Sequence, residues 1–355
     1  MDRLANLTSQ YESHSKAMAF VQLAIAKALS RGSREEAEEI LATRWPHSKH
    51  LDVIRKAAVP AGLTDGWGAP LNPLQGYASE FLELVRPATV LGRMRGFRRI
   101  PFRVRVTQQT AGSRAGWVGE GRPIPVGKLD LDMQTFEYAK VGGIVVISEE
   151  MAKSSEPSAE ALIQRDLVAS IAQFTDEQLL DPSIAEVPYD NPASITHDAV
   201  NVPSSGTGGA EVEADLKALV AALQAAGIEL LFPYFIMKPS TALHLATLKG
   251  TNGERVFPNV NLTGGDIWGI PVLVSASAGN QITLVEASEL LLAEGGVELG
   301  STREAALQMD SDPADGPAEL VSLFQNNLLG LKAVRTIRWQ MRTPAAVAYV
   351  SGVTY

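Results

Sequence analysis

The chain of 355 residues is 45% hydrophobic and 20% charged, which gives it enough apolar side chains for a substantial core. It has no cysteine, so disulfide frameworks, thiolate metal sites and cysteine nucleophiles are excluded. A net charge of −9 makes the protein as a whole a poor binder of polyanions, because DNA-binding surfaces are normally basic.

The first part of the chain, residues 1–58, has the pattern of helices without that of a compact domain. Ser33 followed by Glu36 resembles a capping box at the start of one helix, and Pro46 interrupts that helix. The segment is polar, alanine-rich and highly charged, which favours a helical hairpin or a coiled arm. Residues 59–75 are rich in proline and glycine and have no periodicity, so they are predicted to be an extended arm or linker.

A strict alternation of apolar and polar residues runs through residues 99–107, which is the period of a strand with one buried face. A second alternating stretch and an apolar run occupy residues 129–147. Between them, residues 109–128 hold five glycines and two prolines and are too irregular for a regular element. We therefore expect a long two-stranded hairpin with a loose tip. Because a lone ribbon of this kind is marginal in water, it needs a partner to cover its apolar face.

The first strand of this hairpin and the residues before it carry a concentration of arginine. Six arginines occur without one acidic residue among them: Arg93, Arg95, Arg98, Arg99, Arg103 and Arg105. One hypothesis is that they bind an acidic patch on an adjacent subunit, with Glu149, Glu150, Glu156 and Glu160 as the candidate residues. The alternative is a solvated strand face that pairs internally with Asp130 and Asp132, although exposed pairs contribute only about 0–1 kcal/mol each. A nucleic-acid role is disfavoured by the acidic balance of the chain.

Trp117 lies in the glycine-rich tip of the hairpin, where a monomer would leave its ring exposed. Large aromatic side chains concentrate at the centres of interfaces, so we predict that Trp117 is an anchor buried in a partner subunit. Packing beneath its own loop is the alternative. Glu120 lies in the same tip and is assigned to the same interface.

A long helix is expected over residues 154–180, ended by the Asp-Pro pair that follows. Its apolar stripe has helical spacing and consists of Ile163, Leu167, Ile171 and Phe174. Residues 205–310 then alternate short helical and strand patterns, which predicts a compact α/β subdomain. Strands return over residues 320–339 and 345–350 after a turn-rich segment.

Motifs for catalysis or cofactor binding are not recognised in the chain. His47 and His50 have no third ligand nearby, which favours surface residues over a zinc site. The glycines of Gly206–Gly209 precede a helix but lack the lysine of a phosphate-binding loop and the spacing of a dinucleotide fingerprint. The longest apolar runs, such as Gly142–Ile147, are too short to cross a bilayer. We therefore expect no enzymatic activity, no metal, no cofactor and no membrane partner.

Four stretches, taken in chain order, resemble the major capsid proteins of tailed bacteriophages with the Hong Kong 97-type fold. They are similar to the tip of that family's extended E-loop, its spine helix, a turn of its axial domain and the closing strand of its peripheral domain. In this chain the four stretches are Trp117–Pro125, Ile147–Leu180, Trp268–Val272 and Asn327–Ala346. The resemblance covers residues 60–355.

The resemblance implies an α+β chain divided into the parts of that capsid fold. They are a helical extension at 1–58 that is a candidate scaffold segment, an N-arm at 59–75, a peripheral domain at 76–204 plus 311–355, and an axial domain at 205–310. The peripheral domain would include an E-loop at 96–147 and the spine helix at 154–180. In this family the hairpin lies across a neighbouring subunit, which would supply the cover that the ribbon needs.

The function that the resemblance implies is structural. Pentamers and hexamers of this chain would close into an icosahedral shell that encloses phage DNA without binding it specifically. The virion capsid is the expected location and the host cytoplasm the site of assembly, with portal, decoration or scaffold proteins and a prohead protease as further partners. An encapsulin-like nanocompartment is the alternative within the fold, but residues 1–58 favour a virus because encapsulins lack a cleavable scaffold segment. A monomeric nucleic-acid-binding protein is the alternative of another class.

Some family members join their subunits by an isopeptide bond between an E-loop lysine and an asparagine, assisted by a glutamate. The asparagine position is Asn327 in this chain, but the lysine and glutamate positions hold Ile124 and Val334. We therefore predict no autocatalytic cross-link. Cleavage and retention of residues 1–58 are both compatible with the sequence.

Overall fold

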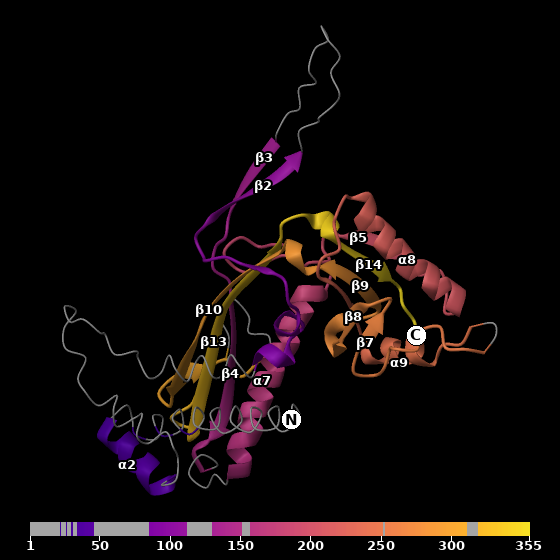
Figure 1. The fold of residues 1–355 in the computed structure, drawn as a ribbon. Coiled ribbons are helices and arrows are strands. Elements are labelled where there is room, and N and C mark those ends of the chain that lie inside the picture. Colours follow the sequence, from indigo (N-terminus) through magenta and orange to yellow (C-terminus); the bar gives the residue numbers. More distant parts are fainter. Residues whose placement is uncertain are drawn as a thin grey trace, which may run out of the picture. The chain divides into compact units, whose positions relative to one another are not determined.

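The computed structural model describes residues 34–45, 85–111, 130–150, 157–250, 253–310 and 319–355, together with residues 22, 26 and 30. These residues form two compact units (Figure 1). The first unit draws on Met1–Arg93, Val141–Thr175 and Gly295–Thr336, and the second on Met94–Lys140, Asp176–Glu294 and Ile337–Tyr355. Within the described ranges, no helix has the length and apolar character needed to span a membrane. Helices and sheets occur together, as the predicted α+β class requires.

The first unit is built from helices and from parts of a four-stranded sheet. Its elements are α2 (Arg34–Arg44), α5 (Val90–Arg93), β11 (Ala306–Leu307), β12 (Val321–Ser322) and most of β4 (Lys140–Ser148) and α7 (Pro157–Leu180). The sheet has the order β1-β10-β13-β4, where β1 is Arg98–Arg99. Its longest strands, β10 (Leu290–Thr302) and β13 (Leu328–Met341), contribute residues to both units.

The helix α7 confirms the expected long helix as far as the structure describes it. It ends at Leu180, directly before the Asp-Pro pair that was predicted to stop it. Leu167 and Ile171 from the predicted apolar stripe are buried. Phe174, the last residue of the stripe, is 46% exposed. Its ring lines a groove of the first unit.

The second unit contains a six-stranded sheet with the order β5-β14-β9-β6-β8-β7. In chain order the strands are β5 (Val200–Pro203), β6 (Pro233–Met237), β7 (Gly265–Ile267), β8 (Ile270–Val274), β9 (Gln281–Glu286) and β14 (Val347–Ser351). The helices α8 (Gly209–Ala225) and α9 (Pro239–Thr247) accompany it, with short 3-10 turns at Ala276–Ala278, Ala287–Glu289 and Pro344–Ala346. The pairs β5–β14 and β6–β8 are parallel, and the other pairs are antiparallel.

The core of the second unit forms where α8 covers strands β14 and β5 (Figure 1). Four residues of α8 recur at helical spacing and are fully buried: Val212, Leu216, Leu219 and Leu223. They pack with alternate residues of the strands, among them Phe235, Ile282 and Val350. This core confirms the helix and strands that the sequence predicts between residues 205 and 310.

The expected long hairpin is interrupted on both strands. Only β2 (Arg105–Ala111) and β3 (Asp130–Thr135) pair with each other, and β1 instead pairs in parallel with β10. The interruption falls at Arg103, whose φ of 61° places it in the left-handed region that ends a strand. The apolar residues Ile100 and Phe102 pack against a small buried cluster of Phe136, Leu291 and Ala293. The strict alternation therefore spans two separate strands.

The predicted internal charge pairing of the hairpin is wrong in its register. Arg105 lies opposite Thr135, whereas Asp132 lies opposite Gln108 and Asp130 opposite Ala111. The ribbon begins at residue 105, and an irregularity between Gln109 and Ala111 changes only the partner of Asp130.

The C-terminal strand does not lie where the sequence-based domain boundaries placed it. Both β5 and β14 were expected in a peripheral domain, yet they occupy one side of the six-stranded sheet beside β9. Four consecutive residues of β14, Val347–Val350, are buried there. Both edges of β14 are hydrogen-bonded, to β5 on one side and to β9 on the other. The division of the structure into units therefore differs from the boundaries at 204/205 and 310/311.

Candidate subunit interface

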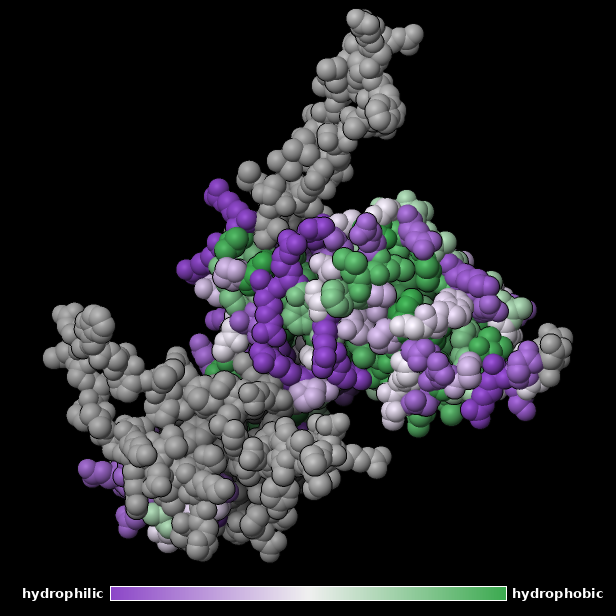
Figure 2. All heavy atoms as spheres, in the orientation of Figure 1, coloured by the Kyte–Doolittle hydropathy of each residue, from purple (hydrophilic) through white to green (hydrophobic). Residues whose placement is uncertain are grey.

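The arginine stretch, defined as Arg95–Arg105, lies on the surface of the second unit. Figure 2 shows hydrophilic residues along the segment that leads to β2. All five arginines of the stretch are exposed: Arg95, Arg98, Arg99, Arg103 and Arg105. None of them forms an ion pair with any residue that the structure describes. Two of them stack on aromatic rings, Arg99 over Phe97 at 5.6 Å and Arg103 over Tyr138 at 5.0 Å.

The backbone of the arginine stretch is fixed at both ends. At its start, the backbone N–H of Arg95 donates to the Tyr234 hydroxyl at 3.0 Å. Gly96 has a φ of 91°, and a Cβ at this position would lie 2.4 Å from Cγ of Phe232, so only glycine fits. At its other end, the N–H of Arg103 donates to the carbonyl of Phe136 at 2.8 Å. The positive charges are therefore displayed from an ordered backbone.

Arg93, the remaining member of the predicted cluster, belongs to the first unit. It is the last residue of α5, and its Nε donates to the carbonyl of Thr89 at 3.4 Å. Its side chain is half-buried. Arg93 therefore differs from the five exposed arginines that follow it.

Of the predicted acidic partners of these arginines, one already forms an ion pair within its own chain. Glu149 pairs with Arg303 at 3.3 Å within the first unit, and their side chains are only 16% and 20% exposed. The backbone N–H of Glu149 also donates to the carbonyl of Asn327. Glu150 is exposed. Glu149 is thus already neutralised inside its own chain. The predicted site residues Trp117, Glu120 and Glu156 lie outside the described residues.

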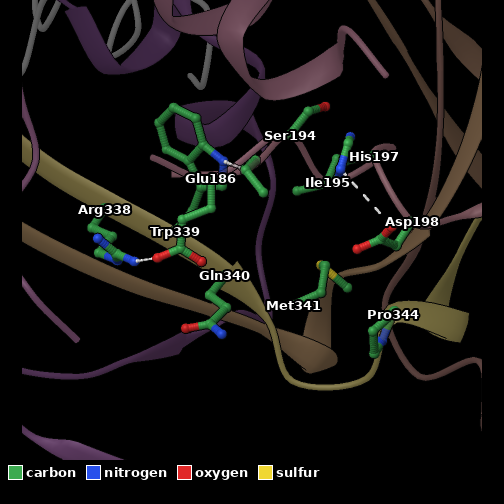
Figure 3. A pocket seen from close by; sticks show the side chains of 11 residues that line it. Glu186, Ser194, Ile195, His197, Asp198, Arg338, Trp339, Gln340, Met341 and Pro344 are labelled. Carbon is green, nitrogen blue, oxygen red and sulfur yellow. Dashed lines mark hydrogen bonds and ion pairs between the residues drawn. The ribbon is translucent and has the colours of Figure 1, made fainter. Parts of the chain in front are cut away.

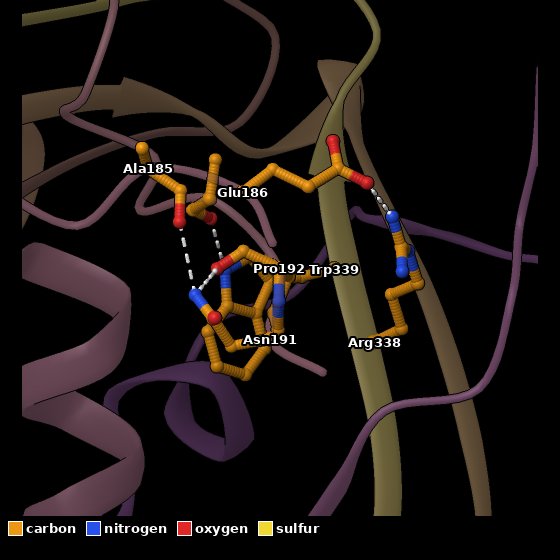
Figure 4. A network of polar contacts seen from close by, with 7 residues as sticks. Ala185, Glu186, Asn191, Pro192, Arg338 and Trp339 are labelled. Carbon is orange, nitrogen blue, oxygen red and sulfur yellow. Dashed lines mark hydrogen bonds and ion pairs between the residues drawn. The ribbon is translucent and has the colours of Figure 1, made fainter. Parts of the chain in front are cut away.

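A tight loop at Ala185–Pro192, in the connection between α7 and β5, presents an exposed aromatic residue. Tyr189 is 78% exposed and has a φ of 69°. The loop is closed by Val187 and Asn191, whose backbones are bridged, and the Asn191 amide donates to the carbonyls of Ala185 and Pro192 at 3.0 and 3.1 Å (Figure 4). The Pro-Tyr-Asp-Asn-Pro sequence was the available signal, because proline and asparagine favour tight turns.

The base of this loop is attached to strand β13 by two side chains (Figure 4). Arg338 is buried and forms an ion pair with Glu186, while its guanidinium lies 5.6 Å from the centre of the Phe136 ring. The indole N–H of the neighbouring Trp339 donates to the carbonyl of Ala193 at 3.0 Å. A buried guanidinium that loses its carboxylate is costly, so the loop and the strand are held together.

A cavity of about 160 Å³ lies next to this attachment in the second unit (Figure 3). It is lined by Glu186, Ala193, Ser194, Ile195, His197, Asp198, Arg338, Trp339, Gln340, Met341 and Pro344. His197 is positioned by a contact of its Nδ1 with the carbonyl of Pro182 at 3.0 Å, and its Nε2 lies 3.9 Å from Asp198. A polar cavity of this size accommodates ordered water. The described residues contain no group of three or more potential metal ligands.

The first unit has a larger, mainly apolar groove of about 940 Å³. Strand β4, helix α7 and residues 306–310 line it. Its walls include three large apolar side chains that are about half exposed: Ile144, Phe174 and Met309. Exposed apolar surface of this kind often marks contacts with other molecules.

The pKa of one side chain at the C-terminus is raised above its ordinary value. Burial and, to a smaller extent, the nearby Asp215 carboxylate raise the pKa of Tyr355 to about 12. The Tyr355 ring packs beside His244 with ring centres 4.6 Å apart, and its backbone carbonyl accepts from Thr241 at 2.7 Å. The C-terminal residue is therefore part of the second unit's core.

Comparison with known proteins decides the family of this chain. A family model described as the phage capsid family matches residues 88–352. The chain belongs to the phage capsid family. A capsid polyprotein of Pseudomonas phage PAJU2 is 40% identical over 321 residues, which cover 85% of this chain and 48% of that relative. This capsid-family chain thus spans about half the length of the relative.

Solved structures show the same fold at low sequence identity. A chain of Mycobacterium phage Ogopogo has a TM-score of 0.56 at 18% identity, over 74% of this chain and 91% of its own length. A chain of Gordonia phage Cozz has a TM-score of 0.53 at 16% identity, over 76% and 85%. A chain of a native GTA particle capsid reaches 0.51 at 12% identity, over 75% and 91%. The family match includes the arginine stretch, the Tyr189 loop and nearly all of the second unit.

Proposed function

We propose that this capsid-family chain is the major capsid protein of a tailed bacteriophage and that many copies form the icosahedral shell around its DNA. The match of residues 88–352 to the phage capsid family is the observation that carries the proposal. The chain would act as a structural component of the virion, without catalytic activity. Pentamers and hexamers would be its assembly units, because identical copies associate through symmetric interfaces.

We propose the Hong Kong 97-type arrangement for the parts of the chain. In it, α7 is the spine helix, residues 96–147 with the β2–β3 ribbon are the E-loop, and the six-stranded sheet belongs to the axial domain. This assignment keeps residues 1–58 as a helical extension and 59–75 as the N-arm. It moves β5 and β14 from the peripheral to the axial domain, since both are hydrogen-bonded into that sheet. The likeness to solved phage structures supports the fold.

The subunit interface that we propose includes the arginine stretch, which has five exposed charges and no ionic partner among the described residues. Trp117, Glu120, Glu150 and Glu156 remain proposed members of the interface on sequence grounds. Glu149 is a weaker member because Arg303 already neutralises it. Exposed charges of one sign favour oriented encounter with a complementary surface.

The location and the further partners of the protein are also proposals. Assembly would take place in the host cytoplasm, with portal, decoration or scaffold proteins and a prohead protease as partners. Residues 1–58 are the proposed scaffold segment. The net charge of −9 supports a shell that encloses DNA without binding it specifically.

Expression of the full chain alone, followed by sedimentation velocity and negative-stain electron microscopy, tests the shell function. We expect closed particles of uniform diameter that sediment far ahead of the single subunit. Mass spectrometry of the particles then shows whether residues 1–58 are present. A chain that stays a folded monomer across salt concentration, pH and protein concentration would contradict the proposal.

A further inference from the structure

We propose that the loop Ala185–Pro192, called the knob, binds the arginine stretch Arg95–Arg105 of a second copy of this chain. The inference rests on the shell function proposed above and names one contact between copies. It also replaces the acidic partner expected from the sequence, since Glu149 is paired within its own subunit.

The knob exposes six consecutive residues, 185–190. Tyr189 is 78% and Val187 is 49% exposed, so two large side chains face outward from one short turn. Tyrosine is enriched among the few residues that dominate binding energy at protein interfaces. A covered Tyr189 would bury a large apolar ring and still leave its hydroxyl free to form a hydrogen bond.

The backbone of the knob is held in a conformation that tyrosine rarely adopts. A φ of 69° is uncommon for any residue other than glycine, and such strain costs on the order of 1–3 kcal/mol. The Asn191 amide holds the turn through the carbonyls of Ala185 and Pro192. At the base, the Glu186–Arg338 ion pair fixes the turn to β13 (Figure 4). A side chain fixed before binding loses less conformational entropy when a partner covers it.

The charges of the knob region and of the arginine stretch are opposite. Residues 181–198 contain four acidic residues and no lysine or arginine: Asp181, Glu186, Asp190 and Asp198. Arg338 neutralises Glu186, but Asp190 forms no ion pair with any described residue. The arginine stretch has the reverse composition and is equally unpaired among the described residues. Arginine already stacks on Tyr138 within this chain, so the Tyr189 ring offers a second mode of contact.

A second copy, and not the same chain, is the partner that this arrangement favours. Both segments belong to the second unit, and each is fixed there by its own hydrogen bonds. Arg338 stacks on Phe136 and pairs with Glu186, yet Asp190 reaches none of the five arginines. Each copy therefore presents both halves of a complementary pair. Repetition of such a head-to-tail contact closes a ring when the rotation between successive copies divides a full turn.

A charge exchange tests the contact. One variant carries Asp190→Arg, a second carries Arg103→Asp with Arg105→Glu, and a third combines all three changes. We expect each of the first two to lower the yield of sedimenting particles by about tenfold, because like charges would then face each other in every contact. The combined variant should recover most of the loss, because opposite charges again face each other in every contact. Glu229→Arg, an exposed reversal in the same unit outside both segments, is the matched control and should assemble like the natural chain.

A further variant, at the tip of the knob, distinguishes loss of the contact between copies from loss of folding. Tyr189→Asn keeps a residue that tolerates the left-handed conformation and removes the exposed ring. The isolated subunit should keep its circular dichroism spectrum and melting temperature, while particle yield falls. Single variants that assemble like the natural chain, or a combined variant that recovers nothing, would overturn the inference and leave the shell function intact. A natural chain that forms no particles would contradict both.

Discussion

The six-stranded sheet and the β2–β3 ribbon contrast in how they are supported. The sheet is covered by α8, and four residues of that helix are fully buried against it. The ribbon has two strands that pair only with each other among the described residues. A two-stranded ribbon is marginal by itself, whereas a covered sheet of six strands has its own core. The sheet therefore stabilises the subunit, whereas the ribbon and the arginine stretch at its root belong to the subunit contacts that we propose.

The largest effect is expected from a change in the core of the sheet. Leu216→Ala removes a fully buried side chain of α8, so the free energy of unfolding should fall by about 2–5 kcal/mol. Val104→Ala at the root of the ribbon, where the side chain is exposed, should change it by less than about 0.5 kcal/mol. Urea denaturation of isolated subunits measures both. Equal losses would remove the contrast between the two regions.

A smaller effect is expected where the knob is attached. Glu186→Gln leaves the buried guanidinium of Arg338 without its carboxylate, so unfolding should become easier by about 1–3 kcal/mol. Glu229→Gln removes an exposed acidic residue of the same unit and serves as the control. Thermal unfolding followed by circular dichroism gives the difference. If the two variants unfold at the same temperature, the attachment does not stabilise the knob.

The smallest effect concerns pH. The pKa of Tyr355 is raised to about 12, above the value of about 10 for an exposed tyrosine, so the folded state favours the neutral phenol. Its contribution is therefore fully present below pH 10 and is lost as the pH rises toward 12. Tyr355→Phe cannot ionise and should lose less stability over this interval than the natural chain. Parallel pH dependences from chemical denaturation at pH 9 to 12 would contradict this assignment.

Much of the fold could be predicted because the local patterns there agree with the tertiary structure. The spacing of Val212, Leu216, Leu219 and Leu223 predicts α8, and the Asp-Pro pair predicts the end of α7. The alternation through residues 99–107 was misleading, since it continues across a break at Arg103. Periodicity reports which residues face a core but not which strand lies beside them. The parallel pairing of β1 with β10 therefore could not be read from either segment.

The candidate interface was only half predictable. The arginines are visible as a run of one charge, and the structure places five of them on the surface without ionic partners among the described residues. The knob was missed because a Pro- and Asn-rich connection gives no sign that its one aromatic residue is fixed and exposed. Arg338, 152 residues away from Glu186 in sequence, supplies that fixation through its ion pair with Glu186. The pairing of Glu149 with Arg303 was hidden for the same reason.

Amide hydrogen exchange, compared between isolated subunits and assembled particles, tests the central claim most directly. We predict that exchange slows on assembly in the ribbon, residues 105–111 and 130–135, and in the arginine stretch and the knob, while β6, β9 and α8 keep the protection they already have. If the ribbon, the arginine stretch and the knob exchange at the same rate in both states, other copies do not cover these segments. That result would contradict the proposed subunit contacts.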